Sequence, residues 1–251
     1  MLAFTLPSQA HFQLVYTPQI TLEKPAILPF KLVFTHPHHN GHTMDMGTPE
    51  AFYYIHKGKK KDLMGTLKPI TWQGASNQGK AYQSEVKIKR NGDYIFVLEP
   101  APYYEKKEDI YIQQITKSFV NKGAMPTGWN EPLDLKTEIV PLNKPYNLFV
   151  GSTFSGQVLS DGKPVPGLEL EIEYINNEPN MKANRFSDKA ATTPPASAMV
   201  VITDHNGIFT FGIPRAGFWG FAALGSGPDK EHKSKELSQD AVLWIRALDM
   251  K

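Results

Sequence analysis

The chain has 251 residues and no cysteine, and this absence removes several classes of site. Without thiolates there are no disulfides, no iron–sulfur clusters and no cysteine-bound zinc. No apolar run approaches the ~18 residues of a membrane-spanning helix, so we do not expect the chain to span a membrane. The formal net charge is only +2, and the one basic run is "KGKKK" at 57–61. Nucleic acid is therefore not an expected partner.

Helical periodicity is also lacking. No long segment places its apolar residues 3.6 positions apart, and 20 prolines and 19 glycines interrupt the chain. Short runs rich in β-branched and aromatic residues occur instead, which is typical of strands. One short helix is predicted near Asp62–Thr66. The predicted strands of the first half are Phe12–Tyr16, Phe30–Thr35, Ala51–His56, Tyr82–Lys89, Tyr94–Leu98 and Tyr111–Val120.

A second set of strands follows a break at Pro141, Pro145 and Gly151. The run "LELEIEYI" alternates strictly, which predicts a strand with one dry face and one wet face. The runs "GFWGFAAL" and "AVLWIRAL" are apolar enough for central strands. The polar stretches 176–197 and 225–239 are predicted to be long loops.

Three dipeptides predict tight turns between strands. They are Asn91-Gly92, Asp161-Gly162 and Asn206-Gly207, whose residues tolerate positive φ and are typical of hairpins. Repeated short strands separated by turn signals favour β-sandwiches. We therefore predict an all-β fold with two β-sandwich domains in tandem, an N-terminal domain at 11–150 and a C-terminal domain at 151–251.

The first ten residues, "MLAFTLPSQA", predict the remnant of a signal peptide. A short apolar run precedes Ser8 and Ala10, which are small residues at the −3 and −1 positions of a signal-peptidase site. Cleavage after Ala10 would make His11 the first mature residue and place the protein in the periplasm. An ordinary N-terminal extension is the alternative interpretation.

The densest chemical signal is "THPHHNGHTMDMGTP" at 35–49, which holds four of the eight histidines. Neutral imidazole is a common ligand of nickel, copper and zinc, whereas thioether sulfur favours Cu(I). A mature N-terminal histidine adds a chelate between its ring and its α-amine, which titrates near ~7.7–8.0. The predicted ligands are His11, His36, His38 and His42. This nitrogen-rich set suits Ni(II) or Cu(II).

Weaker candidates lie nearby. If the strand that ends at Thr35 continued, His36 and His38 would share one face. A turn at 40–41 would then bring two methionines opposite this pair. The alternative interpretation makes the histidines an adventitious surface cluster and the methionines core residues. The weaker candidates are His39, Met44, Met46 and His56, and the last is expected to approach the same rim from the end of the next strand.

Motifs of catalysis are lacking. The chain has no Gly-x-Ser-x-Gly, no His-Glu-x-x-His and no phosphate-binding glycine-rich loop before a helix. The stretch "PYYEKKED" at 102–109 gathers carboxylates, but its two lysines favour a surface ion-pair cluster. We therefore predict that the protein is not an enzyme.

Two long stretches, "TFSGQVLSDGKPVPGLELEIEYIN" and "VVITDHNGIFTFGIPRAGFWGFAAL", resemble a bacterial periplasmic family of nickel and cobalt uptake components, the NikK-like proteins. Shorter matching stretches are "PYYEKKEDIYIQQITK", "GWNEPLDLKTEIVPLNKPYNLFVG" and "FTHP…MDMGTPEAF". The resemblance covers most of the chain from His11 to Met250. It implies two immunoglobulin-like or transthyretin-like β-sandwich domains that capture Ni(II), with Co(II) as a second metal, for membrane transporter components.

The resemblance also implies site residues. It maps the family's first mature histidine onto His11, its His-Pro pair onto His36-Pro37 and its methionine pair onto Met44 and Met46. The additional histidines between 38 and 42 depart from that pattern. The leading hypothesis is a periplasmic Ni(II)-binding protein that delivers or buffers metal for a transporter.

Three other hypotheses stay open. One is a copper redox enzyme with an N-terminal histidine brace, which would consume oxygen or peroxide. Another is a periplasmic copper chaperone that binds Cu(I) through Met44 and Met46. The third is an extracellular interaction module whose histidines bind metal adventitiously.

Overall fold

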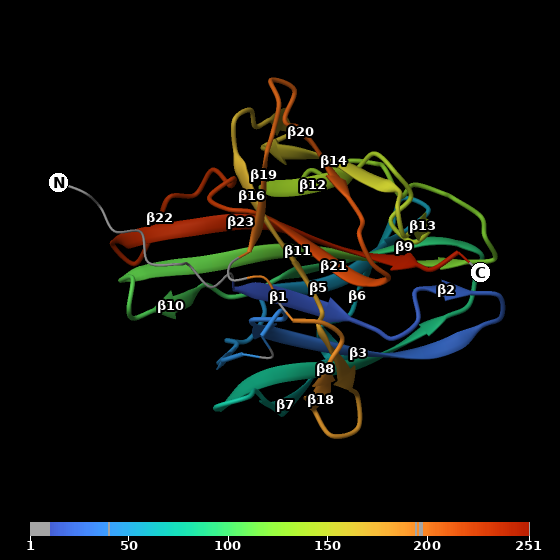
Figure 1. The fold of residues 1–251 in the computed structure, drawn as a ribbon, viewed down its shortest axis with the longest axis horizontal. Coiled ribbons are helices and arrows are strands. Elements are labelled where there is room, and N and C mark those ends of the chain that lie inside the picture. The colour runs from blue at the N-terminus through green and yellow to red at the C-terminus, as the bar shows by residue number, and fades with distance from the viewer. Residues whose placement is uncertain (1–10, 40, 194, 196–197, 251) are drawn as a thin grey trace.

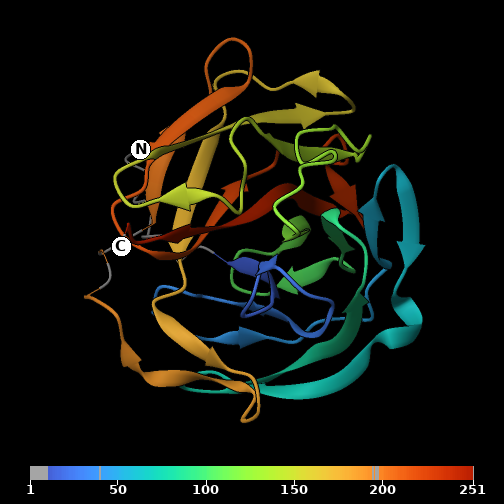
Figure 2. The same ribbon diagram turned by 90° about the vertical axis from the view of Figure 1, so that its right-hand side faces the viewer.

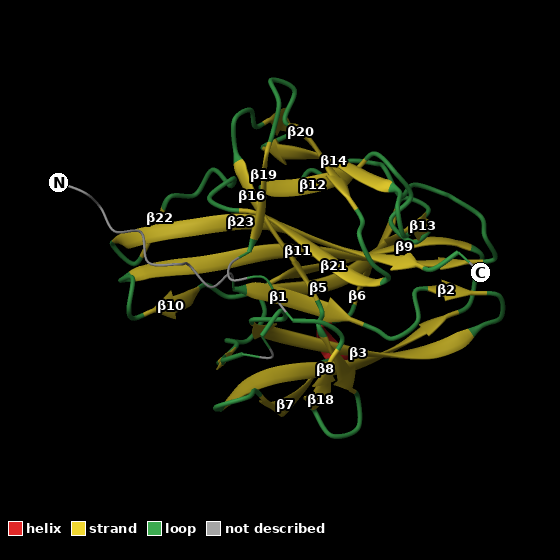
Figure 3. Ribbon diagram, viewed as in Figure 1, coloured by secondary structure: helices red, strands yellow, loops and turns green. Residues whose placement is uncertain are grey.

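The structure is a computed structural model that describes residues 11–39, 41–193, 195 and 198–250. Strands make up nearly all of its regular elements, as Figure 3 shows in yellow. One turn of 3-10 helix, η1 (Met64–Thr66), confirms the short helix predicted there. The predicted all-β sandwich class is also confirmed, because the strands form three sheets with apolar cores between them. The predicted signal-peptide remnant at 1–10 lies outside the described residues.

The largest sheet has 12 strands and draws on both halves of the chain (Figure 1). Its main path runs β19-β16-β21-β23-β11-β9-β5-β6, and four short strands join at the sides. The strands of the main path are β19 (Met199–Ile202), β16 (Glu169–Tyr174), β21 (Gly217–Ala223), β23 (Lys235–Leu248), β11 (Ile110–Lys122), β9 (Gly92–Glu99), β5 (Ala51–His56) and β6 (Lys59–Asp62). The short strands are β2 (Thr21–Leu22), β10 (Tyr103–Glu105), β13 (Leu148–Phe149) and β22 (Glu231–His232).

Two smaller sheets cover parts of this sheet. The seven-stranded sheet has the order β1-β3-β8-β7-β18-β17, with β4 added to β3. Its strands are β1 (Phe12–Tyr16), β3 (Ala26–Thr35), β8 (Gln78–Ile88), β7 (Lys68–Gln73), β18 (Arg185–Ala190), β17 (Asn177–Asn180) and β4 (Thr43–Met44). The four-stranded sheet consists of β12 (Thr137–Pro141), β14 (Thr153–Ser160), β15 (Lys163–Pro164) and β20 (Ile208–Gly212).

Aromatic side chains fill the space between the layers. Phe154 of the four-stranded sheet packs on Phe221 of the large sheet with ring centroids 4.9 Å apart. Phe30 of the seven-stranded sheet packs on Phe96 at 4.4 Å. Burial of such rings supplies much of the stabilisation of a sandwich, and offset or tilted pairs add to it. The two small sheets are therefore fixed to opposite regions of one central sheet.

Strands from the two halves of the chain are hydrogen-bonded neighbours. β11 and β23 run parallel over residues 111–117 and 237–243. On the other side of the molecule, Arg185 of β18 pairs with Gln73 of β7. Figure 2 shows this orange hairpin beside the blue and teal strands of the first half. The domain boundary near residue 150 stays a prediction, but the sheets continue across it.

The hairpins predicted at Asn91-Gly92 and Asn206-Gly207 are wrong. Asn91-Gly92 joins β8 to β9, and Asn206-Gly207 joins β19 to β20, but in both cases the two strands belong to different sheets. Positive φ values of 126° at Gly92 and 71° at Gly207 still make the turns, so the chain crosses between layers there. Asp161-Gly162 does close a hairpin, that of β14 with β15.

The two predicted loops contain regular structure. Residues 176–197 include the β17–β18 hairpin, and residues 225–239 include β22 and the start of β23. The predicted central positions of "GFWGFAAL" and "AVLWIRAL" are confirmed, because β21 and β23 are neighbours inside the large sheet.

The wet face predicted for β16 is exposed at Glu169 but buried at its other two glutamates. Glu171 is 8% exposed and Glu173 is 2% exposed. Ala222, opposite Glu171 in the register, packs in one cluster with Phe12 and Trp244. The start of β1 therefore covers the face that an isolated strand would leave to water.

A buried ion pair joins β11 to β12. Lys117 Nζ lies 2.6 Å from Glu138 Oε2, with both side chains no more than 2% exposed. The N–H of Leu133 donates to the other carboxylate oxygen at 2.8 Å. Burial lowers the pKa of Lys117, and Glu138 partly offsets that effect. Both charges are thus paired in the interior.

Replacing one partner of this ion pair is expected to destabilise the fold more than replacing both. Glu138→Leu leaves a buried ammonium without a partner and should lower the free energy of unfolding by about 3–5 kcal/mol. The double variant Lys117→Met with Glu138→Leu should recover most of that loss, because no charge remains. Urea unfolding followed by circular dichroism measures both. Equal losses for the single and double variants would contradict the prediction.

Candidate metal centre

The register of β1, β3 and β4 assembles the histidine-rich corner. β3 pairs with β4 through Thr35↔Thr43, which confirms the predicted reversal of the chain between them. On its other side β3 pairs with β1 through Phe12↔Thr35. One step further along this antiparallel register, His11 stands opposite His36, and their ring centroids are 4.5 Å apart. Two of the four predicted ligands are thus brought together.

Gln114 of β11 fixes the position of His11. Its Nε2 donates to the carbonyl of His11 at 2.8 Å, and its Oε1 accepts from the N–H of Gln13 at 2.7 Å. Nε2 also lies 3.2 Å from Asp240 Oδ2. This buried amide holds the backbone on both sides of Phe12. The position of the His11 backbone, from which its ring extends, is therefore fixed.

Glu105 at the end of β10 faces the same histidine. Its Oε2 lies 3.4 Å from His11 Nε2, and the two side chains are 13% and 16% exposed. The β10–β11 hairpin is held from outside, because Asp109 bonds to both Tyr104 and Lys235. The sequence pattern had suggested only a surface ion-pair cluster at 102–109. The contact arises because the hairpin folds beside the start of β1.

Burial lowers the pKa of His11, and Glu105 partly opposes this by attraction and hydrogen bonding. His42 and Lys107 lower it further, so His42 is close enough to act on His11 electrostatically. A neutral imidazole keeps a lone pair for a metal, whereas an imidazolium does not. The ring is therefore in the metal-binding protonation state at neutral pH.

The loop that carries His42 packs against His36. The N–H of Gly41 donates to the His36 carbonyl at 3.1 Å, and a Cβ at Gly41 would lie 3.0 Å from the Cβ of His36. Asn77 holds the next residues, since its side chain bonds to both the N–H and the carbonyl of Thr43. Its Nδ2 also lies 3.3 Å from His42 Nε2. His42 is exposed at this corner.

His38 points into the second half of the chain instead. Its ring centroid is 4.3 Å from that of Tyr174, and its Nδ1 lies 3.6 Å from Glu173 Oε1. Its backbone N–H donates to Glu173 Oε2 at 3.2 Å, and its side chain is fully buried. The expectation that His36 and His38 share a face is wrong, because residues 37–39 form a turn rather than continuing β3.

The methionines belong to the core, as the alternative interpretation predicted. Met44 is 1% exposed and Met46 is 4% exposed, and both pack in the cluster around Phe30 and Phe52. Met46 Sδ also accepts a hydrogen bond from Gln13 Nε2 at 3.6 Å. His39, the remaining loop candidate, is exposed.

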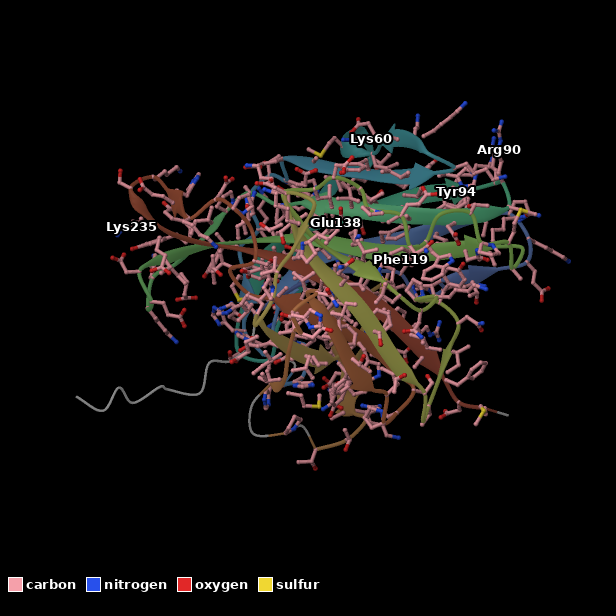
Figure 4. The ribbon with its side chains drawn as sticks, turned by 90° about the horizontal axis from the view of Figure 1, so that it is seen from above. Lys60, Arg90, Tyr94, Phe119, Glu138 and Lys235 are labelled. Atoms are coloured by element: carbon pink, nitrogen blue, oxygen red, sulfur yellow. The ribbon has the colours of Figure 1, made fainter. Side chains whose placement is uncertain are left out.

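His56 lies far from this corner, so the expectation that it approaches the same rim is wrong. It stacks on Tyr94 at 4.1 Å, beside the Asp93 carbonyl at 2.8 Å. In the register Glu105 is opposite residue 110 of β11 and Asp93 is opposite residue 121, which is roughly 35 Å apart at ~3.3 Å per residue. Figure 4 shows Lys235 and Tyr94 toward opposite ends of the molecule.

The corner therefore offers imidazole nitrogen and carboxylate oxygen, which are ligand types for Ni(II), Cu(II) and Zn(II). Among the described residues, no three His, Cys, Asp or Glu side chains stand in a ready-made arrangement for a metal ion. The predicted α-amine ligand requires a chain that begins at His11, and residues 1–10 lie outside the described part. That described part also holds no helix long and apolar enough to cross a membrane.

Fold and corner together define a β-sandwich protein with histidines gathered at the start of its first strand. Residues 8–227 match the family described as Domain of unknown function (DUF4198), and the chain belongs to this family. That description assigns no activity, so the link to NikK-like nickel uptake stays a prediction. No curated protein matches the chain.

Similar solved structures include an adhesin, a domain pair of intimin and a fragment of titin. The Yersinia pseudotuberculosis adhesin InvE is 13% identical with a TM-score of 0.25, covering 92% of this chain and 58% of its own. The D0-D1 domain of intimin is 9% identical with a TM-score of 0.22, covering 91% of this chain and 95% of its own. The titin fragment I67-I69 is 8% identical with a TM-score of 0.21, covering 96% of this chain and 67% of its own. This chain thus spans little more than half of the InvE structure, and TM-scores this low carry no argument for function.

The contact of His38 with Glu173 is electrically neutral. Burial raises the pKa of Glu173 to about 8, although the His38 backbone hydrogen bond opposes the rise. Burial likewise lowers the pKa of His38 to about 3. At neutral pH the junction therefore holds a protonated carboxyl and an uncharged imidazole.

Glu173→Gln is expected to flatten the pH dependence of stability between pH 4.5 and about 8. In this window the unfolded carboxyl ionises while the folded one keeps its proton, so stability falls as the pH rises, by up to about 1.4 kcal/mol per unit. Glutamine has no proton to lose. Urea unfolding between about pH 5 and 7.5 measures the slope. An unchanged slope would show that Glu173 is already ionised in the folded protein.

Proposed function

We propose that this protein binds Ni(II) in the periplasm and delivers or buffers it for membrane transporter components. Co(II) or Cu(II) would suit the same nitrogen donors. The observation that carries the proposal is the β1–β3 register, which sets His11 beside His36 with Glu105 on the far nitrogen of the His11 ring. The proposal includes no catalysed reaction.

The proposed ligands are His11, His36 and His42. In a chain that begins at His11, the α-amine and Nδ1 of this residue form one chelate. Glu105 faces Nε2, and a carboxylate that holds one ring N–H fixes the tautomer and leaves the other nitrogen free to bind metal. His38 leaves the proposed set, because its ring is buried against Tyr174.

The choice of metal follows from the donors. All three ligands supply nitrogen, the chain has no thiolate, and both methionines of the loop are buried in the core. Soft sulfur donors select Cu(I), whereas imidazole and amine donors favour Ni(II) and Cu(II). The arrangement therefore supports the nickel proposal over a Cu(I) chaperone.

Loss of any proposed ligand is expected to weaken Ni(II) binding strongly. In chains that begin at His11, His11→Ala, His36→Ala and His42→Ala should each raise Kd by about tenfold or more, because each removes a nitrogen donor. Isothermal titration calorimetry measures this. His205→Ala is the matched control, since His205 is exposed in a turn far along the chain. The proposal fails if the triple variant keeps the affinity of the control.

The α-amine has its own test. A chain that retains residues 1–10 carries a peptide nitrogen at His11, which is not a free amine, and is expected to bind Ni(II) more weakly than the chain that begins there. The same calorimetry compares the two forms. Equal affinity would remove the amine from the site while leaving the imidazoles in place.

Glu105→Ala is expected to weaken Ni(II) binding by about 10–100-fold, the usual effect of removing a carboxylate that orients a ligating histidine. Glu108→Ala is the matched control, because Glu108 is an exposed carboxylate on the same hairpin. Calorimetry at constant pH separates the two. If both variants lose affinity equally, the hairpin acts only through its overall negative charge.

A further inference from the structure

The two edges of the 12-stranded sheet differ in how they are protected. β6 ends one edge with Lys59–Asp62, four charged and exposed residues that discourage pairing with another strand. β19 ends the other edge with "MVVI", which has neither charge nor proline. Val200 is 46% exposed and Ile202 is 66% exposed. An apolar, uncharged edge of this kind is suited to accept a further strand.

The backbone of β19 has hydrogen-bonding groups on its open side. The N–H of Thr203 donates to the Leu168 carbonyl of β16 at 2.9 Å, and the register continues without a shift to Met199. Residues alternate in direction along an antiparallel strand, so Val200 and Ile202 point their N–H and C=O groups away from β16. In the described ranges no strand follows β19 in the sheet.

The face beside these side chains is acidic. Glu171 is opposite Val200 and Glu169 is opposite Ile202, so each carboxylate shares a face with an exposed apolar side chain. Among the described residues neither glutamate has a cationic partner. Burial, Glu169 and Asp240 together raise the pKa of Glu171 to about 7. The exposed carboxylate of Glu169 is therefore the group at this edge that can accept a cation from a partner, whereas Glu171 is only 8% exposed.

We propose that the β19 edge docks an extended segment of a partner protein in which apolar and basic residues alternate. The segment's backbone pairs with Val200 and Ile202, as in other complexes formed by strand addition. Its apolar side chains cover these two residues, and a lysine or arginine of the segment reaches the exposed carboxylate of Glu169. A second β19 edge fits less well, because it brings further carboxylates and no cation.

The proposal is independent of the metal site, since β19 shares no residue with the histidine corner. Its probe is a fluorescein-labelled acetyl-Lys-Val-Lys-Val-Lys-Val-Lys-amide, and fluorescence anisotropy against the full chain measures binding. Ile202→Lys and Val200→Lys are expected to weaken binding by about tenfold or more, because they place like charges together. Ile27→Lys is the matched control, since Ile27 is 61% exposed on β3. A probe with glutamate in place of lysine is expected not to bind.

Ile202→Pro tests the backbone pairing separately. It removes an N–H on the open side and leaves the bonds to β16 intact, so it should also weaken binding of the probe. The proposal is overturned if Ile202→Lys binds the probe as tightly as Ile27→Lys, or if the glutamate probe binds equally well. It is also overturned if the protein forms a concentration-dependent dimer that Ile202→Lys abolishes, because the occupant is then a second copy.

Discussion

The parallel pairing of β11 with β23 is the interaction on which the other features depend. It joins residues 111–117 to residues 237–243, which are far apart in the chain. β11 carries β9 and the side chain of Gln114, while β23 carries β21 and through it β16. Contacts between such distant segments form only after a long loop has closed, which is slow. The anchor of His11, the hairpin of Glu105 and the edge at β19 therefore share one frame that exists only when both halves have folded together.

Buried ionisable groups hold this frame in two different ways. Lys117 and Glu138 form an ion pair inside the sandwich, with Nζ 2.6 Å from Oε2. Glu173 and His38 reach the interior as uncharged groups, because no counter-charge is close enough to compensate for their loss of water. This difference separates the histidines. His38 belongs to the junction between the two halves, whereas the partly exposed corner at His11 stays accessible to a cation.

Local patterns predicted the strands well, because alternation of side chains is a property of a few adjacent residues. Ala51–His56, for example, is a strand with the predicted bounds. Turn chemistry at Asn91-Gly92 predicted the positive φ but not the sheet to which the next strand belongs, since that depends on distant partners. Residue type alone singled out the histidines of the corner. The pattern around Glu105 indicates only a surface ion-pair cluster, and no pattern singles out Gln114, because only the placement of the β10–β11 hairpin brings them to His11. The turn at 37–39 directs His38 away from the corner, and no sequence signal there is as strong as the histidines around it.

A carrier must release its metal as well as bind it. The three proposed ligands are held with unequal firmness, which suits both steps. His11 is fixed by a buried amide and His36 by the strand register, so two donors hold their places without metal. His42 sits on an exposed loop, where its Nε2 lies 3.3 Å from Asn77 Nδ2. Moving one ring of a loop requires far less rearrangement than moving a strand of the sheet. In the proposed function, exchange of metal would therefore proceed through His42, while His11 and His36 keep their places.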